Sequence, residues 1–220
     1  MKIFTGPLSM FGAKVQIAAL EKGIHFETIM VPFDANDSYQ PKHPEVLRVN
    51  PKRQVPVLID GDVELFDSTQ IFEYLEDRVP DPPLWPAAVA ERAAARLLEH
   101  KSDEVFFPHV IRLMGLQNEM QSAPAVDACA ACAHFYGELE QQLVGKEFLA
   151  GAYGFADIAF FMAHVFAHRK GAGMRPATPG LVAWRDRVGE RPAVRQGVGP
   201  LMRFLASQGR AVPDFLQSLA

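Results

Sequence analysis

Apolar and polar residues change their spacing from one element to the next in the first third of the chain. Met1–Thr5 reads as a short strand, and apolar residues at helical spacing then run from Phe11 to Lys22. Gly23 follows, and glycine commonly ends a helix because it adopts the left-handed conformation. His25–Phe33 reads as a second strand, so these segments predict a β-helix-β unit with a right-handed crossover.

A short helix, a hairpin and a third helix are predicted next. Glu45–Val49 has helical spacing and follows a loop rich in polar residues and prolines. Within Val55–Phe66, two apolar runs flank the turn Asp60–Asp62 with its central glycine, which predicts an antiparallel hairpin. Asp67 stands three residues before Gln70, the form of a capping box, and opens the third helix. The predicted order is β-α-β-α-β-β-α.

A proline-rich segment separates this pattern from the rest of the chain. Four prolines lie between Arg78 and Pro86, and they exclude both regular helix and the interior of a sheet. Beyond this segment nearly every apolar pattern has the helical period. The sequence therefore predicts an α/β domain over residues 1–80, a linker over 81–87 and an all-helical domain over 88–220.

Charge and hydropathy narrow the classes of partner. The 220 residues include 22 Lys and Arg against 26 Asp and Glu, with no long run of one sign, so nucleic acid and anionic membranes are not expected partners. The chain begins without the basic and then apolar pattern of a secretory signal, which favours a cytoplasmic protein. The most apolar window, Phe155–Ala167, contains Asp157 and is shorter than the roughly 18 residues that a membrane span needs.

Two pairs of residues have spacings that suggest chemistry, but their contexts favour other roles. Cys129 and Cys132 form a CAAC sequence, yet they lie inside a continuous helical pattern without the positive charge that stabilises a redox thiolate. We therefore expect small helix-packing residues. His164 and His168 share a helix face, but no acidic or cysteine partner stands at a suitable spacing, so no metal site is expected.

Three other positions leave a structural and a functional interpretation open. Pro56, at the start of a strand, is either part of a plain turn or follows a cis bond that presents the Val55 backbone to an extended peptide. Asp67 and Ser68 either cap their helix or present its N-terminus to a ligand that carries a carboxylate and an ammonium group. Ser9, between the first strand and the first helix, is a nucleophile, a cap or a hydrogen-bond donor. The nucleophile is disfavoured because no histidine accompanies Ser9 in its motif.

Taken together, four motifs resemble those of one family. GPLSMFGAKV stands at the first turn, NPKRQVPVLIDG before the hairpin, LFDSTQIFEYLED in the third helix and FLAGAYGFADIAF in the helical region. Their order and spacing resemble cytosolic glutathione S-transferases of the serine type, phi-like or bacterial, over essentially the whole chain. The resemblance implies a thioredoxin-like N-terminal domain followed by a helical domain.

The resemblance also implies a glutathione site, made by Ser9, Lys42, Arg53, Gln54, Val55, Pro56, Asp67 and Ser68. In this family the residue at Val55 pairs through its main chain with the cysteinyl part of glutathione, and Pro56 is the cis-proline. Asp67 and Ser68 would hold the γ-glutamyl end, while Lys42 and Gln54 help to hold the peptide. Arg53 is an additional basic contact near the glycyl carboxylate. Ser9 would face the sulfur and donate a hydrogen bond to the thiolate.

Departures from related patterns restrict the chemistry. A cysteine at position 9 would imply mixed-disulfide chemistry, but the residue is serine. The serine-cysteine run of zeta-type isomerases is also missing, which disfavours maleylacetoacetate isomerisation. Gly154 stands where the family usually has a serine or threonine cap, and glycine loses only a few tenths of a kcal/mol relative to a hydroxyl cap.

The leading interpretation is a cytoplasmic, homodimeric glutathione transferase that serves detoxification and uses no metal. It would conjugate glutathione to a hydrophobic electrophile, or use it in displacement or peroxide reduction. The alternatives are a non-catalytic adaptor of the same fold and a carrier of hydrophobic ligands. Phe11, Phe106 and Phe107 are candidates for the pocket of the second substrate, and the alternative for each is a place in the core.

Overall fold

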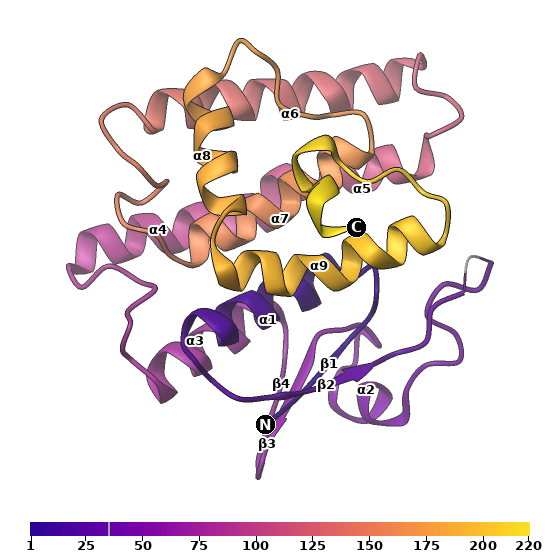
Figure 1. The fold of residues 1–220 in the computed structure, drawn as a ribbon, viewed down its shortest axis with the longest axis vertical. Coiled ribbons are helices and arrows are strands. Elements are labelled where there is room, and N and C mark those ends of the chain that lie inside the picture. Colours follow the sequence, from indigo (N-terminus) through magenta and orange to yellow (C-terminus); the bar gives the residue numbers. More distant parts are fainter. Residues whose placement is uncertain (35) are drawn as a thin grey trace. The chain divides into compact units, whose positions relative to one another are not determined.

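The computed structural model describes residues 1–34 and 36–220, and the chain divides into two compact units (Figure 1). The first unit comprises Met1–Pro82, Pro192–Arg210 and Ser218–Ala220, and the second comprises Pro83–Arg191 and Ala211–Gln217. The break between Pro82 and Pro83 falls inside the predicted linker. The first unit also takes in a late helix that the sequence placed in the helical domain.

The first unit follows the predicted order of elements and adds the late helix. Its elements are β1 (Lys2–Thr5), α1 (Met10–Glu21), β2 (Glu27–Met30), α2 (Pro44–Val49), β3 (Val57–Asp60), β4 (Val63–Phe66), α3 (Ser68–Arg78) and α9 (Pro192–Ser207). The strands form one sheet in the order β2-β1-β3-β4. β1 and β2 are parallel, whereas β3 pairs antiparallel with both β1 and β4. The β-helix-β unit and the hairpin are thus confirmed.

Apolar residues cover both faces of this sheet. Phe4 of β1 and Val57 of β3 pair with each other and pack with Val46 of α2 on one face. The neighbouring strand residues point to the opposite face because side chains alternate along a strand, and that face is covered by α1 and α3. α1 packs in turn against α9, where Gly197 lies so close to Ile17 that an added Cβ would come within 2.5 Å of it.

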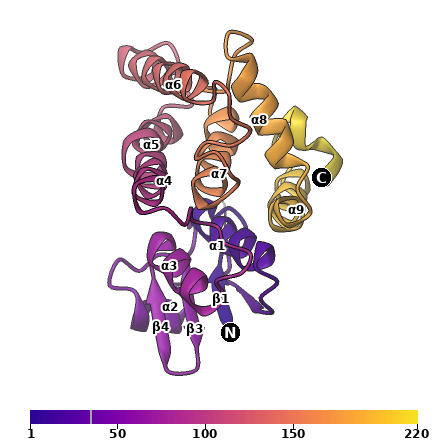
Figure 2. The same ribbon diagram turned by 90° about the vertical axis from the view of Figure 1, so that its left-hand side faces the viewer.

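The second unit is helical. Its elements are α4 (Val89–Lys101), η1 (Ser102–Phe106), α5 (Phe107–Gly115), α6 (Ala123–Gln142), α7 (Phe155–Arg169), α8 (Pro179–Gly189) and η2 (Asp214–Leu219), of which η2 belongs to this unit up to Gln217. Figure 2 shows α4, α5 and α8 around α7, whose residues Phe155–Ala167 are all buried. The most apolar window of the sequence is therefore the central helix of this unit. Within the described parts of the chain, no helix combines the length and the apolar character of a membrane span.

A single π-helical turn, η1, joins α4 to α5. Pro108 is the second residue of α5, and it lacks the N–H that would continue the regular hydrogen-bond pattern from the preceding turn. A wider turn at that place lets the chain continue as a helix without that bond.

The start of α7 is fixed by Asp157. One oxygen of its carboxylate accepts the Leu149 N–H at 3.0 Å and the Trp184 indole N–H at 2.7 Å, and the other accepts the Gly154 N–H at 3.0 Å. Burial nevertheless raises the pKa of Asp157 to about 6, because the loss of hydration outweighs these three donors.

Gly154 precedes α7, where the resemblance led us to expect a hydroxyl cap, and the structure gives the physical reason for glycine. The carbonyl oxygen of Leu84 accepts the Phe155 N–H at 3.1 Å, so a main-chain group satisfies one free N–H of the first turn. A Cβ on residue 154 would lie 2.2 Å from that same oxygen. The Leu84 carbonyl therefore occupies the place of a larger cap residue.

Candidate functional site

Strand register brings the predicted site segments to one end of the sheet. Thr5 at the end of β1 pairs with Met30 at the end of the parallel strand β2. Val57, the first residue of β3, pairs with Phe4 on one side and with Phe66, the last residue of β4, on the other. The segments that follow β1, β2 and β4 and the segment that precedes β3 therefore share this end.

Ser9 follows β1 and is the N-cap of α1. Its backbone is extended, with φ −89° and ψ 109°, and its side-chain oxygen accepts the Gly12 N–H at 3.0 Å. A serine hydroxyl has acceptor lone pairs and one O–H donor, and this bond uses only an acceptor. Among the described residues the Ser9 proton has no acceptor. Capping the helix and donating to a ligand are therefore compatible.

Gly12 holds Ser9 close to a second hydroxyl. A Cβ on Gly12 would lie 1.8 Å from Oγ1 of Thr5 and 3.0 Å from Oγ of Ser9, so glycine is required at this position. The Thr5 hydroxyl is buried and has no hydrogen-bond partner in the described part of the chain. A buried hydroxyl without a partner is costly, and this one remains available to a bound group or a water molecule.

Tyr39 is a site residue that the sequence did not reveal. It lies on the loop after β2, and its hydroxyl oxygen accepts the Leu8 N–H at 3.1 Å. Burial raises the pKa of Tyr39 to about 12, so the phenol is neutral at physiological pH. Its ring lies over Gly6, where a Cβ would come within 2.1 Å. Tyr39 thus fixes the turn that leads to Ser9.

The segment before β3 presents an unpaired backbone. The Val55–Pro56 bond is cis, as predicted. Among the residues described, neither the N–H nor the C=O of Val55 has a hydrogen-bond partner. Asn50, which is buried, shapes this loop: its amide donates to the Gln54 carbonyl at 2.6 Å, and its side-chain oxygen accepts the Lys52 N–H at 2.9 Å. The sequence reasoning missed Asn50, since it stands at the expected end of a helix.

Asp67 and Ser68 begin α3 at the end of β4. Asp67 has φ 75° and ψ 126°, a conformation that costs roughly 1 to 3 kcal/mol for a residue other than glycine and that concentrates at functional sites. Its carboxylate accepts the Thr69 N–H at 3.0 Å rather than the Gln70 N–H, so the capping-box prediction was wrong in its partner. Ser68 is 4% exposed, and its hydroxyl has no partner within the described chain.

The remaining predicted contacts are polar side chains on the neighbouring loops. Lys42 is half-buried, whereas Arg53 and Gln54 are exposed. None of these side chains has a hydrogen-bond or ion-pair partner among the described residues, and Arg53 has a positive φ of 56°. The structure places them at the same end of the sheet but gives no contact between them and Ser9 or Ser68.

The three phenylalanines lie in different surroundings. Phe11 is half-buried on α1, and the Lys14 ammonium lies 5.2 Å from its ring centre. Phe106 is fully buried among the rings of the second unit, with the Phe160 ring at 5.0 Å, and Phe107 is nearly as buried. The structure favours the core alternative for Phe106 and Phe107, and their place in a substrate pocket stays a prediction.

The CAAC cysteines lie in the interior of α6, away from its N-terminus. Both are free, and Cys132 is buried. Burial, together with the neighbouring Cys129, raises the pKa of Cys132 to about 12, which keeps it protonated at neutral pH. A dithiol redox centre needs a stabilised thiolate, and this arrangement opposes one.

The histidine pair belongs to a buried cluster. The Tyr136 hydroxyl donates to the Ala172 carbonyl at 2.8 Å, so the ring nitrogen Nδ1 of His164, at 3.1 Å, donates to Tyr136. Burial lowers the pKa of both His164 and His168, which keeps them neutral at pH 7. Across residues 1–34 and 36–220, no group of three or more metal-ligating side chains comes together.

Comparisons with known proteins agree with this geometry. Residues 3–83 match the family model described as "Glutathione S-transferase, N-terminal domain". The chain is 31% identical over 204 residues to "Probable glutathione S-transferase GSTU1" of Oryza sativa subsp. indica, an alignment that covers 85% of this chain and 84% of the relative. It is 36% identical over 109 residues to "Stringent starvation protein A homolog" of Coxiella burnetii, and that match spans 49% of this chain and 48% of the relative.

One of the similar solved structures contains bound glutathione. It is a glutathione transferase from Burkholderia graminis with two glutathione molecules bound per protein subunit. The sequences are 28% identical, the TM-score is 0.76, and the match covers 90% of this chain and 86% of that one. Proteins named as transferases and proteins named for stringent starvation are therefore both similar to this chain.

Proposed function

This chain belongs to the glutathione S-transferase family, and we propose that it binds glutathione at the end of the sheet described above and transfers the glutathione sulfur to an electrophile. The observation that carries the proposal is a set of polar groups that have no partner among the described residues, at that end of the sheet. They are the Ser9 O–H, the Val55 main chain and the Ser68 hydroxyl. Each group matches one part of the peptide.

The Val55 main chain would receive the cysteinyl residue as a strand receives its neighbour, through its N–H and C=O. Ser68 and the N-terminus of α3 would bind the γ-glutamyl carboxylate, because the positive end of a helix favours an anion. Asp67 would bind the ammonium group. Lys42 and Gln54 would hold the peptide, and Arg53 would contact the glycyl carboxylate.

Ser9 would act on the sulfur. The Ser9 O–H donates to the thiolate, and the N-terminus of α1 adds favourable potential. Lowering a thiol pKa by two units from about 8.5 requires about 2.7 kcal/mol of preferential thiolate stabilisation. One charge-assisted hydrogen bond contributes roughly 1.5 to 3 kcal/mol, so these two features suffice.

The reaction begins when the thiol loses its proton to solvent. The thiolate attacks an electrophilic carbon and a C–S bond forms. In a substitution the leaving group departs with its electron pair; in an addition the π electrons of an activated double bond move onto its activating group, and the resulting anion takes a proton from solvent. Displacement reactions and peroxide reduction start from the same thiolate. Phe11, at the first turn of α1, is our candidate for contact with the hydrophobic second substrate.

We also propose a cytoplasmic homodimer. Exposed apolar side chains lie along consecutive helical segments of the second unit, at Leu97 on α4, Val105 on η1 and Ile111 on α5. Apolar surface of this kind is typical of protein interfaces. Sedimentation should give twice the chain mass at micromolar concentration, and a monomer mass would contradict the proposal.

A second candidate function is a non-catalytic adaptor. It is favoured by the similarity to the protein named as a stringent starvation protein A homolog. Calorimetry with glutathione, followed by a panel of electrophiles and hydroperoxides, separates the two functions. Binding with turnover supports the transferase, and binding without turnover favours the adaptor. Absence of glutathione binding by the folded protein would overturn the proposed site.

A further inference from the structure

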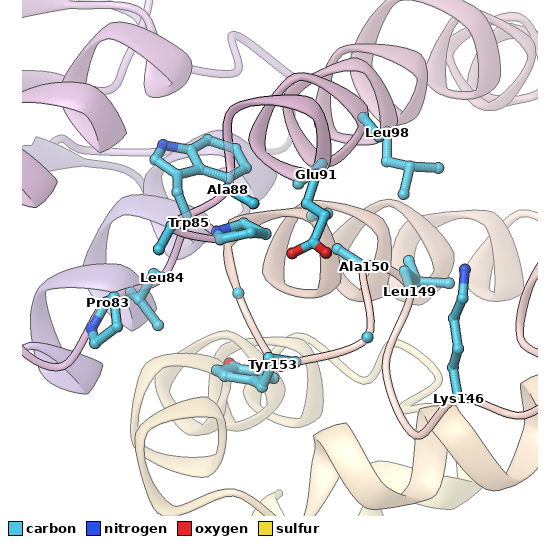
Figure 3. A pocket seen from close by; sticks show the side chains of 18 of the residues that line it. Pro83, Leu84, Trp85, Ala88, Glu91, Leu98, Lys146, Leu149, Ala150 and Tyr153 are labelled. Carbon is cyan, nitrogen blue, oxygen red and sulfur yellow. The ribbon is translucent and has the colours of Figure 1, made fainter.

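A cavity of about 770 Å³ lies within the second unit (Figure 3), but its two aromatic rings are already covered. The Arg96 guanidinium lies 5.8 Å from the centre of the Trp85 ring, and the Arg191 guanidinium lies 3.6 Å from the centre of the Tyr153 ring. A smaller cleft in the first unit differs, because several of its polar groups have no partner among the described residues.

The smaller cleft has a volume of about 410 Å³, within the range of roughly 300 to 1,000 Å³ that small-molecule sites occupy. It is bounded by the second half of α1, the segment Ile24–Thr28 that leads into β2, and one face of α9. Glu27, the first residue of β2, pairs with Lys2 at the start of β1, whereas the proposed glutathione site follows Thr5 and Met30 at the other end of these strands. The cleft and the glutathione site therefore lie at opposite ends of the sheet.

The cleft carries a positive charge that is not neutralised within it. Arg203 on α9 and His25 before β2 both line it, and neither side chain has a hydrogen-bond or ion-pair partner within the described chain. The Arg203 guanidinium reaches back along α9, since a Cβ on Gly199 would lie 3.0 Å from its Nη1. The described residues that line the cleft include no Asp or Glu. An anion would therefore meet an unpaired guanidinium.

Pro200 adds a main-chain acceptor to the same cleft. It lies inside α9 and has no N–H, so the carbonyl oxygen of Gln196, four residues earlier, loses its regular helical hydrogen bond. Gln196, Pro200 and Arg203 share one face of the helix, and all three line the cleft. Because the guanidinium reaches back to Gly199, it lies within about one helical turn of this carbonyl along the axis of α9.

The walls formed by α1 and β2 supply further polar groups and apolar surface. Nε2 of Gln16 donates to the Thr28 hydroxyl oxygen at 2.9 Å. That bond leaves the Gln16 amide oxygen and the Thr28 O–H without a partner among the residues described. Leu20 and Ile24 add aliphatic surface. The cleft thus combines one unpaired cation, a hydroxyl donor, two acceptors and a short apolar wall.

We propose that this cleft binds an N-acyl amino acid with an apolar side chain. The carboxylate would pair with Arg203, and the amide N–H, one carbon away, would donate to the Gln196 carbonyl. The acyl oxygen would accept the Thr28 O–H, and the side chain would lie against Leu20 and Ile24. A free amino acid suits the cleft less well, because the guanidinium would repel its ammonium group and no lining carboxylate would compensate.

N-acetyl-L-leucine and N-acetyl-L-leucinamide test the charge, because they differ in whether the terminal group is a carboxylate or a neutral amide. Titration of isotope-labelled protein, followed by NMR, should shift the amide signals of Gly197, Arg203 and Ile24–Thr28. The carboxylate should bind about threefold to fivefold more tightly, the size of a partly exposed ion pair. Arg203→Gln should remove this preference. Arg210→Gln removes another exposed arginine of the same unit, which does not line the cleft, and should retain it.

A methylated probe tests the Gln196 carbonyl. N-acetyl-N-methyl-L-leucine lacks the N–H and should bind the wild type about threefold to tenfold more weakly than N-acetyl-L-leucine, as expected for one lost hydrogen bond. Pro200→Ala restores an N–H to the Gln196 carbonyl, so this variant should bind both probes equally. Pro192→Ala is the control and should retain the difference, because the first N–H of a helix has no helical acceptor.

Four results would overturn the proposal. They are the absence of signal shifts around the cleft, equal affinity for the carboxylate and the neutral amide, an Arg203→Gln protein that keeps the preference, and shifts concentrated at Ser9 and Ser68. The last result would place the probe in the proposed glutathione site instead. If Pro200→Ala changes the fold, the comparison of Arg203→Gln with Arg210→Gln decides alone.

Discussion

The side-chain oxygen of Ser9 accepts the Gly12 N–H at 3.0 Å, and the Ser9 proton remains without an acceptor in the described chain. One hydroxyl can therefore cap the N-terminus of α1 and donate to a ligand at the same time. The sequence left open whether Ser9 is a cap or a functional donor. The geometry allows both roles at once.

Ser9→Ala should lower stability by about 1 kcal/mol, the usual loss for a helix cap, while the fold and most glutathione affinity remain. The conjugation rate at neutral pH should fall at least about tenfold, because the thiolate loses its donor. Part of the rate should return at high pH, where glutathione ionises without help. Initial rates against pH, with saturating glutathione, check this.

Two results would contradict that role for Ser9. Unchanged turnover would transfer it to Thr5, whose buried hydroxyl lacks a partner among the described residues, or to main-chain N–H groups. Complete loss of activity at every pH would instead support a nucleophilic serine.

Ser68→Ala should weaken glutathione binding by roughly 1 to 3 kcal/mol, because a buried polar group of the ligand would lose its partner. Titration calorimetry measures the change. Ser207→Ala is the matched control, since Ser207 is an exposed serine at the end of α9 in the same unit. An affinity equal to that of the wild type, in a folded Ser68→Ala protein, would leave Ser68 with a structural role at the start of α3.

Gly154→Ala should lower the free energy of unfolding by about 1 to 3 kcal/mol, because the new Cβ would overlap the Leu84 carbonyl oxygen. Gly137→Ala is the control: Gly137 lies inside α6, and apart from its chain neighbours and the nearby backbone of α6 itself, no atom of the described residues lies within 4 Å of an added Cβ. That substitution should stabilise the protein by roughly 0.5 to 1 kcal/mol. Urea unfolding separates the two effects, and a neutral Gly154→Ala would show that the Leu84 segment moves aside easily.

Asp157→Asn should change how stability depends on pH. The pKa of Asp157 in the folded protein, about 6, lies above the ordinary value of 3.8 for an aspartate, so its protonation stabilises the folded state. This contribution is complete below about pH 4 and is lost as the pH rises through about 6. Between pH 7 and pH 5 the wild type should therefore gain about 1 kcal/mol relative to Asp157→Asn.

Urea unfolding of both proteins at several pH values measures that gap. His164 and His168, whose pKa values are lowered by burial, destabilise both proteins on acidification and cancel in the comparison. A gap that stays constant from pH 7 to pH 5 would mean that the three N–H donors outweigh the burial of the carboxylate.

The elements of the first unit were predictable because their signals are local. The Asp60–Asp62 turn predicts its hairpin, and Gly23, with a φ of 63°, ends α1 as expected. Tyr39 and Asn50 were not predictable in the same way. Tyr39 reaches Leu8 across 31 positions, and neither the spacing nor the composition of either segment records that contact.

Gly154 is a second case in which a contact between distant segments could not be predicted from the local sequence. Its sequence context suggested only a weaker cap, whereas the reason for glycine is the carbonyl oxygen of a residue 70 positions earlier. The sequence placed α9 in the helical domain, whereas in the structure it belongs to the first unit, and the reason is related. Helical period identifies an apolar face but does not say which partner covers it.

The pairing of α1 with α9 has a consequence for the growing chain. Met1–Pro82 emerges from the ribosome early in synthesis. The surface of α1 that Gly197 covers stays exposed until Pro192–Arg210 has also been synthesised. The first unit to be synthesised is thus the last to be completed. During that interval Ile17 and its apolar neighbours on α1 face solvent or a chaperone, and a ribosome-bound chain arrested before residue 192 should be more open to proteolysis within α1 than the released protein.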